Sequence, residues 1–228
     1  MEHAEHSDIT DDNKDALLLL CACRGLASRV RAVLQAGANA GHINQRGKTS
    51  LTVAMEHKHD AAAELLVQPT IDAGMDIDAQ DSTGKTVLMR ACADGLTNTA
   101  AKLVSLGANP ELKDTNGDTA LMLACANEQE AAARELMEAT KRAGALDLQG
   151  GQYKRSALHL ASAKGLAGTV AQLLALGADP FLTDKVYRYP HVLICRLMYV
   201  CVCVCLCVCV CVCVCVCVCV YIDCSHHT

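Results

Sequence analysis

An internal repeat constrains the fold of this chain more than any other feature. Segment 84–91 (GKTVLMRA) returns further along the chain as segment 117–124 (GDTALMLA). Equivalent anchor positions are Ala16, Thr49, Thr86, Thr119 and Ser156, so a shorter and a longer spacing alternate along the chain. Repeats of this length are typical of architectures in which each unit buries its apolar face by stacking on its neighbours. The sequence therefore predicts a row of five stacked units.

Each unit carries the pattern of two short helices. A leucine follows each anchor by two residues and a cysteine or alanine follows it by five, which places both on one helical face. A second apolar pair comes about twelve residues later, at 33–34, 66–67, 103–104, 136–137 and 173–174. The anchor hydroxyls are placed to cap the first helix. Gly25, Gly95 and Gly165 are placed to end it in the left-handed conformation.

The composition suits thin helical units and argues against several functions. The chain is 52% hydrophobic but has no Trp and one Phe, so Ala and Leu must fill its core. A net charge of −5 supplies no basic field for a phosphate backbone, so no nucleic-acid partner is predicted. The acidic lead, residues 1–13, does not have the pattern of a secretory signal. We therefore expect a cytoplasmic protein whose repeat cysteines are reduced and pack as small apolar side chains.

The third unit resembles the ankyrin repeat. It reads Asp81-x-x-Gly84-x-Thr86-x-Leu88, followed by Ala91, Gly95, Leu103-Val104 and Gly107-Ala108-Asn109. The resemblance covers residues 14–184, with units starting near 14, 47, 84, 117 and 154, and it implies an all-α solenoid of helix-turn-helix units with hairpin-like turns. The family's Thr-Pro-Leu-His core is changed: the Pro position holds Ser50, Val87, Ala120 and Ala157, and the His position is kept only as His159.

Units two and four differ from the others. Lys58 and Glu128 replace the glycine that ends the first helix, and each unit carries four extra residues. In unit four, residues 131–142 read as a longer second helix, whereas Pro69 predicts that the extra residues of unit two form a loop. An Ala-Ala-Ala run recurs at 61–63 and 131–133, so the array also repeats with the period of two units, which indicates duplication of a two-unit block.

The ankyrin resemblance implies that another protein binds to the turn tips and the exposed ends of the first helices. Carried over position by position, this surface consists of Gln45, Arg46, Lys48, Glu56, His57, Ser82, Thr83, Lys85, Asp94, Thr115, Asn116, Asp118, Asn127, Gln152, Tyr153, Arg155 and Lys164. Tyr153 and Arg155 are the expected anchors, because Tyr and Arg are enriched among residues that dominate interface energy. Removing the net +2 of tail 185–228 from −5 leaves −7, which mildly favours a basic or mixed partner.

Catalytic, cofactor and metal motifs are not found. Cys21 and Cys23 lie two apart on a helix, where their side chains point to different faces, so joint metal ligation is not expected. His57 and His59 lie near a helix end without a matched carboxylate or thiol cluster, and His226-His227 is at the chain end. The chain has no phosphate-binding loop and no Gly-x-Ser-x-Gly nucleophile motif. We predict no enzyme activity, although an enzyme subunit whose catalytic part lies elsewhere would also fit.

The repeat pattern stops after Asp184. The next Gly-x-Thr-x-Leu is due at 187–191, where the chain reads YRYPH, and residues 200–220 alternate Cys and Val almost perfectly. The Cys and Val codons TGT and GTG together spell a TG dinucleotide tract, so the run has the pattern of a translated microsatellite. As a strand, it would be apolar on both faces and prone to aggregation.

A membrane role is the alternative for the tail. Residues 200–222 form an uncharged run long enough to span a bilayer as a helix. Arg188 and Arg196 precede the run and Asp223 follows it, so the positive-inside rule would keep the repeats cytosolic. The chain would then be a tail-anchored adaptor, with a membrane as partner only if this anchor is real.

Sequencing the mature transcript tests the microsatellite hypothesis. We expect the spliced message to lack the Cys-Val tract or to continue in frame with further repeats. A message that encodes residues 200–220 as printed would contradict the hypothesis.

Overall fold

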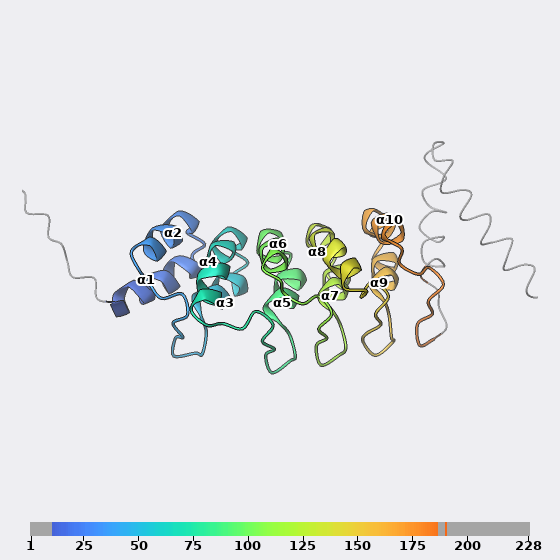
Figure 1. Cartoon of the computed structure of the whole chain (residues 1–228), viewed down its shortest axis with the longest axis horizontal. Coiled ribbons are helices and arrows are strands. Elements are labelled where there is room, and N and C mark those ends of the chain that lie inside the picture. Colours follow the sequence, from blue (N-terminus) through green and yellow to red (C-terminus); the bar gives the residue numbers. More distant parts are fainter. Residues whose placement is uncertain (1–10, 187–189, 191–228) are drawn as a thin grey trace, which may run out of the picture.

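The described part of the chain is a row of helix pairs. A computed structural model describes residues 11–186 and Pro190, and ten helices lie within them. The first helices of the pairs are α1 (Asp11–Cys23), α3 (Ser50–Glu56), α5 (Val87–Asp94), α7 (Ala120–Ala126) and α9 (Ala157–Lys164). The second helices are α2 (Ala27–Gln35), α4 (Asp60–Asp72), α6 (Thr97–Ser105), α8 (Glu130–Arg142) and α10 (Ala167–Leu176). Figure 1 shows the pairs side by side, with the turns projecting from one side of the row.

The core is continuous along the row. First helices pack on neighbouring first helices, as α5 does on α7, and second helices form their own layer, as α4 does on α6. The leucines two residues after the anchors lie at the centre of this core: Leu18, Leu51, Leu88, Leu121 and Leu158 are each at most 1% exposed. The predicted all-α solenoid is confirmed. On the second helices Leu173 is fully buried, but Leu174 of α10 is 37% exposed.

Three of the four described cysteines pack as apolar residues. Cys21, Cys92 and Cys125 are at most 2% exposed, whereas Cys23 is only partly buried. Burial raises the pKa of the Cys125 thiol to about 12 and moves the pKa of Cys92 in the same direction. These two thiols therefore stay protonated at neutral pH and serve the core.

Hydroxyl side chains cap the first helices as predicted. Thr49, Thr86, Thr119 and Ser156 precede α3, α5, α7 and α9, and each accepts a hydrogen bond from the backbone N–H three residues later. The buried His159 completes a capping box, because Ser156 N–H donates to its Nδ1 over 3.3 Å. Ala16 does not match its counterparts, since α1 begins at Asp11 and Ala16 lies inside it.

The residue that ends each first helix is left-handed whether or not it is glycine. Gly25, Gly95 and Gly165 have φ of 66°, 75° and 75°, and Lys58 and Glu128 adopt 58° and 62° in units two and four. A non-glycine residue at such a position costs about 1–2 kcal/mol. The tertiary packing of the array therefore imposes this conformation on Lys58 and Glu128.

The expectation of a loop in unit two was wrong. Helix α4 continues through Pro69 to Asp72 and has the same length as α8, which is the longer helix predicted for unit four. Pro69 lies one turn from the end of α4, and Thr70 beside it is fully buried and donates to Leu66 O over 2.7 Å. Proline inside a helix costs about 3 kcal/mol or more. Burial of the helix on the core outweighs that cost here.

The described residues after α10 keep one contact of the earlier turns. Asp184 is buried and its Oδ1 accepts from Val186 N–H over 2.9 Å, as the equivalent side chains of earlier turns do. Pro190 is helical and buried, and it stands one repeat after Ala157, the first residue of α9. The predicted end of the repeats at Asp184 stays a prediction, because residues 187–189 and 191–228 lie outside the described part of the chain.

The remainder of the tail lies outside the described residues, including the Cys-Val run 200–220 and the suggested membrane span 200–222. Within 11–186 and Pro190, none of the helices is long and apolar enough to cross a bilayer.

Substitution of the left-handed glycines tests how tightly the units pack. A Cβ at Gly25 would approach the His59 ring to 2.5 Å, whereas one at Gly95 would meet only the flexible end of Gln129. We expect Gly25→Ala to lower the free energy of unfolding by about 2–3 kcal/mol, and Gly95→Ala by about 1–2 kcal/mol, the backbone cost alone. Urea denaturation measures both changes.

A His59→Ala background is the control. In that background, Gly25→Ala should lower the free energy of unfolding by no more than Gly95→Ala does in the natural chain. If His59→Ala leaves the effect of Gly25→Ala unchanged, the His59 ring does not limit position 25.

Candidate protein-binding face

An Asn or Asp side chain shapes the turns that project from the row. Asn44 Oδ1 accepts from the backbone N–H of Arg46 over 2.8 Å and of Lys48 over 3.1 Å. Asp81 does the same for Thr83 and Lys85, and Asp114 does so for Asn116 and Asp118. A backbone hydrogen bond of 3.0 Å closes each of these three turns, for example from Asn44 N to Lys48 O. The tip residues are therefore held in a fixed, outward orientation.

Successive turns are joined by backbone hydrogen bonds. Thr115 N–H donates to Thr83 O over 3.1 Å, Gly151 N–H donates to Asn116 O over 2.9 Å, and Lys185 N–H donates to Tyr153 O over 2.8 Å. Within the described residues, turn 44–48 has no such backbone bond to turn 81–85. Figure 1 likewise shows a wider step between α3 and α5 than between α5 and α7.

The fourth turn, 150–155, is one residue longer than turns 44–48, 81–85 and 114–118. Gly150 and Arg155 exchange two backbone hydrogen bonds of 2.9 and 3.0 Å across it, and Lys154, with φ of 48°, takes the place held by glycine in the earlier turns. Gly150 has to be glycine, because a Cβ there would collide with the backbone of Gly117. The extra residue leaves Tyr153 47% exposed.

The two expected anchors contact each other. The guanidinium carbon of Arg155 lies 4.9 Å from the centre of the Tyr153 ring, a cation–π contact. Arg155 Nε also lies 3.6 Å from the buried carboxylate of Asp184. Tyr153 is therefore free to meet a partner, whereas Arg155 is already held inside the array.

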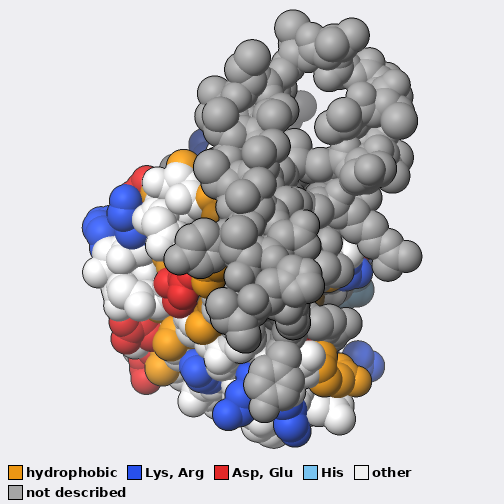
Figure 2. Space-filling model, turned by 90° about the vertical axis from the view of Figure 1, so that its right-hand side faces the viewer, with side chains coloured by type: hydrophobic (Ala, Val, Ile, Leu, Met, Phe, Trp, Pro, Cys, Tyr) orange, Lys and Arg blue, Asp and Glu red, His pale blue; other side chains and the backbone are white. Residues whose placement is uncertain are grey.

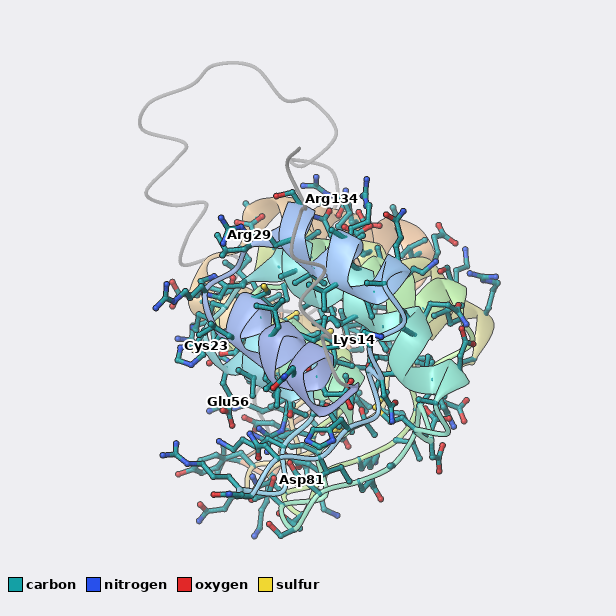
Figure 3. All side chains as sticks on the ribbon, turned by 90° about the vertical axis from the view of Figure 1, so that its left-hand side faces the viewer. Lys14, Cys23, Arg29, Glu56, Asp81 and Arg134 are labelled. Atoms are coloured by element: carbon teal, nitrogen blue, oxygen red, sulfur yellow. The ribbon has the colours of Figure 1, made fainter. Side chains whose placement is uncertain are left out.

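None of the seventeen candidate residues is buried. The exposed ones are Gln45, Arg46, Glu56, His57, Ser82, Thr83, Thr115, Asn116, Asn127, Gln152, Tyr153 and Lys164. The partly exposed ones are Lys48, Lys85, Asp94, Asp118 and Arg155. The turn members lie along the tips, and the helix members lie at the ends of first helices. Viewed along the row, Figure 3 places Glu56 between α1 and the turn of Asp81, and Arg134 at the opposite edge.

Ion pairs engage the candidates at the helix ends. Lys48 Nζ lies 2.6 Å from Glu56 Oε1 within unit two. Between units, Lys58 pairs with Asp94 over 3.3 Å. Glu128 pairs with Lys164 over 2.9 Å. The two inter-unit pairs occupy equivalent positions of the duplicated blocks, so the blocks keep the same bridge with its charges exchanged.

Two carboxyl groups of the turns have shifted pKa values. Burial acts to raise the pKa of Asp81, but hydrogen bonds from Thr83, Arg90 and Lys85 outweigh it and hold this pKa well below its usual range. Burial and then the neighbouring Asp114 carboxylate raise the pKa of Asp118, and Lys85 opposes them. Asp81 is therefore a fixed negative charge that orders its own turn.

The structure adds residues that the sequence reasoning missed. A hollow of about 350 Å³ lies at the N-terminal end of this face, between α1, α3 and turn 44–48. Its lining residues are Leu19, Leu20, Cys23, Asn44, Arg46, Lys48, Val53, Glu56 and His57. The three from α1 were not predicted, because the family's binding positions were carried over only from Gln45 onward. The sequence did hold one indication of these residues. Leu20 lies two residues after the predicted core residue Leu18, so it is an apolar side chain away from the core face of the helix.

In the described part of the chain, a single thiol, that of Cys23, lies beside the paired histidines. Its Sγ lies 3.5 Å from His57 Nε2, and His59 Nε2 lies 3.0 Å from the backbone oxygen of Cys23. The rings of His57 and His59 are stacked, with centroids 6.1 Å apart. Across the described residues, no group of three or more His, Cys, Asp or Glu side chains could hold a metal ion.

Comparison with known proteins agrees with the turns, caps and stacked pairs. The family model "Ankyrin repeats (3 copies)" matches residues 17–114 and again residues 88–184, which together are more than half of the chain. The chain belongs to the ankyrin-repeat family. Ankyrin repeats generally act in protein–protein interaction.

Individual relatives share the repeats to different extents. The ankyrin-repeat chain is 30% identical over 191 residues to the putative ankyrin repeat protein YahD of Escherichia coli. The matched region covers 78% of this chain and 88% of YahD. It is 26% identical to the B-cell lymphoma 3 protein homolog of Mus musculus, over 78% of this chain and 39% of that protein. It is 32% identical over 96 residues to the ankyrin repeat and KH domain-containing protein mask-1 of Caenorhabditis elegans, spanning 4% of that protein.

Replacing Asp81 tests how the turn is held. Asp81→Asn keeps an oxygen for the backbone, as Asn44 does naturally, but loses the charge that pairs with Arg90. We expect the free energy of unfolding to fall by about 1–2 kcal/mol at pH 7. Because the folded pKa lies below the ordinary value, the stabilisation is full above that value and is lost as pH falls through the folded pKa. Urea denaturation at several pH values should show that the difference in free energy of unfolding between the natural chain and Asp81→Asn narrows below about pH 4.

Asn44→Asp is the matched control, since Val53 stands where Arg90 stands in unit three. It should gain no comparable stability. If the loss of stability caused by Asp81→Asn stays constant with pH, the charge of Asp81 does not stabilise the turn.

Proposed function

We propose that this ankyrin-repeat chain binds an acidic segment of another protein along its row of turns and the adjoining ends of its first helices. The observation that supports this most directly is the charge of the turn tips. Six cations stand there, Arg46, Lys48, Lys85, Lys154, Arg155 and Lys185, against the single carboxylate of Asp118. Viewed from the C-terminal end, Lys and Arg side chains gather on the turn side and acidic ones lie further along the flank (Figure 2).

The other carboxylates of the turns offer little to a partner. Asp81, Asp114 and Asp184 stand at the bases of the turns, and backbone N–H groups donate to each of them. Asp114 and Asp184 are at most 6% exposed. Their charge is therefore directed into the turns. Of the six cations, Lys48 and Arg155 pair with Glu56 and Asp184, whereas Arg46, Lys154 and Lys185 are exposed at the tips.

The local charge of the turn tips supports an acidic partner, although the net charge of the whole repeat region is negative. The net charge of −7 up to residue 184 favoured a basic or mixed partner. At physiological salt, however, exposed charges more than about 8 Å apart are largely screened from each other. A segment lying on the tips is therefore governed by the nearby lysines and arginines, and an acidic segment fits better.

The same proposal includes the domain limits and site residues. We take residues 14–184 as the interaction unit and the seventeen candidate residues as its contact surface, with Tyr153 the aromatic anchor. The ion pairs at the helix ends do not prevent binding, because exposed pairs are worth about 0–1 kcal/mol and exchange with a partner's charges. No observation on residues 11–186 or Pro190 favours the membrane-adaptor alternative.

Site-specific crosslinking in cells tests the proposal. A photo-crosslinking amino acid replaces Thr115 at the turn tips or Arg134 on the opposite edge of the full chain. We expect one protein to be captured from position 115 and not from 134, and mass spectrometry to place the crosslink in an acidic segment. The affinity of the captured protein for this chain should fall at least tenfold, about 1.4 kcal/mol, when the chain carries Lys85→Glu plus Lys154→Glu.

The matched control is Arg29→Glu plus Lys141→Glu, two exposed cations on second helices. This variant should bind within about twofold of the natural chain, and added salt should weaken both. Equal capture from positions 115 and 134, or a basic crosslinked segment, would refute the proposal.

A further inference from the structure

The hollow at the N-terminal end of the binding face has an apolar floor. Leu19, Leu20 and Val53 line it, and Leu20 is 48% exposed, among the most exposed large apolar side chains of the described residues. Leu17, one helical turn earlier on α1, is 39% exposed and extends the apolar surface. Adjoining apolar side chains exposed in this way indicate a binding surface.

One cation on the rim of the hollow is unpaired. Lys48 is already paired with Glu56 over 2.6 Å. The guanidinium of Arg46, by contrast, has no hydrogen bond or ion pair to any residue within 11–186 or Pro190. Arginine presents a planar fork of donors that matches a carboxylate. The rim therefore favours an anionic group directly beside the apolar floor.

The opposite wall is fixed in place. The contacts of Cys23 with His57, and of His59 with the Cys23 backbone, tie α1 to the end of α3. Figure 3 shows Cys23 and Glu56 on the same flank of the molecule, above the turns. A hollow held from both sides needs little rearrangement to accept a side chain.

We propose that this hollow binds one bulky aliphatic or aromatic side chain of the partner, next to an Asp or Glu that pairs with Arg46. The assignment rests on the proposed function and names the part of the partner that the first two units recognise. The apolar side chain covers Leu20 and Val53, and its acidic neighbour contacts the guanidinium of Arg46. The hollow thus sets the register of the acidic segment on the turns.

A phage-displayed library of random dodecapeptides, selected on the immobilised full chain, tests this assignment. Enriched peptides, synthesised with a fluorescent label, are titrated against the natural chain and its variants by fluorescence anisotropy. We expect a consensus with a large apolar residue within two positions of Asp or Glu. Leu20→Ser and Arg46→Glu should each weaken binding by about tenfold or more.

Two matched variants control for loss of an exposed leucine or of a cation. Leu174→Ser removes a leucine 37% exposed on α10, and Arg134→Glu reverses an exposed charge away from the turns. Both should bind within about twofold of the natural chain. Circular dichroism of all four variants verifies that each remains folded.

Several outcomes would overturn the assignment. The first is a consensus rich in Lys or Arg. The second is a set of peptides no more enriched on the natural chain than in a parallel selection on the Leu20→Ser protein. The third is an affinity for the peptides that Leu20→Ser leaves unchanged. Peptides weakened by Lys85→Glu but not by Leu20→Ser would leave the proposed function standing without the hollow. Peptides weakened by neither variant would remove both, and loss with Leu20→Ser alone would support the hollow without the row of turns.

The chain's own acidic lead is the competing occupant. Residues 1–10 contain Glu2, Glu5 and Asp8. The full chain carrying Glu2→Gln, Glu5→Gln and Asp8→Asn should bind the peptides within about twofold of the natural chain. Binding at least tenfold tighter would show that the lead fills the hollow and would overturn its assignment to a partner.

Discussion

Shielding of apolar faces between adjacent helix pairs is the interaction on which this structure depends. Each pair is too small to enclose a core, and the fully buried leucines of one pair, such as Leu88, lie against those of the next. The chain has almost no aromatic bulk, so alanines such as Ala91 and Ala124 let the helices approach closely. The turns, the capped helix starts and the binding face all follow from this stacking, because none of these parts is ordered without a neighbour.

The duplicated two-unit block shows how strongly stacking controls local conformation. Lys58 and Glu128 occupy a left-handed position that their own side chains disfavour, and each uses its charged group to reach the following unit. The two bridges have opposite polarity at equivalent positions, with distances of 3.3 and 2.9 Å. The position therefore accommodates a pair of opposite charges in either orientation. Stability in such an array is shared between neighbours, so single positions tolerate unfavourable residues.

The sequence was sufficient for features that repeat with a fixed period and insufficient for those that depend on a single neighbour. Helix pairs, hydroxyl caps and the buried leucines follow from periodicity and were predicted. The continuation of α4 through Pro69 was not, because a local rule for proline omits the burial of Thr70. The hollow was also missed, since it joins α1 to turn 44–48 across residues distant in sequence. The net charge also does not report where the charges lie, so the proposed sign of the partner depends on the turn tips and not on the composition.

The backbone bonds that join successive turns have one gap, between turns 44–48 and 81–85 in the described chain. From unit three onward the tips form a continuous ribbon. On the other side of the gap, the first two units hold the hollow while their second helices remain packed on the rest of the array. At this joint it is the second helices α4 and α6, packed on each other, that connect unit two to unit three, while from unit three onward the tips are also tied by their own backbone.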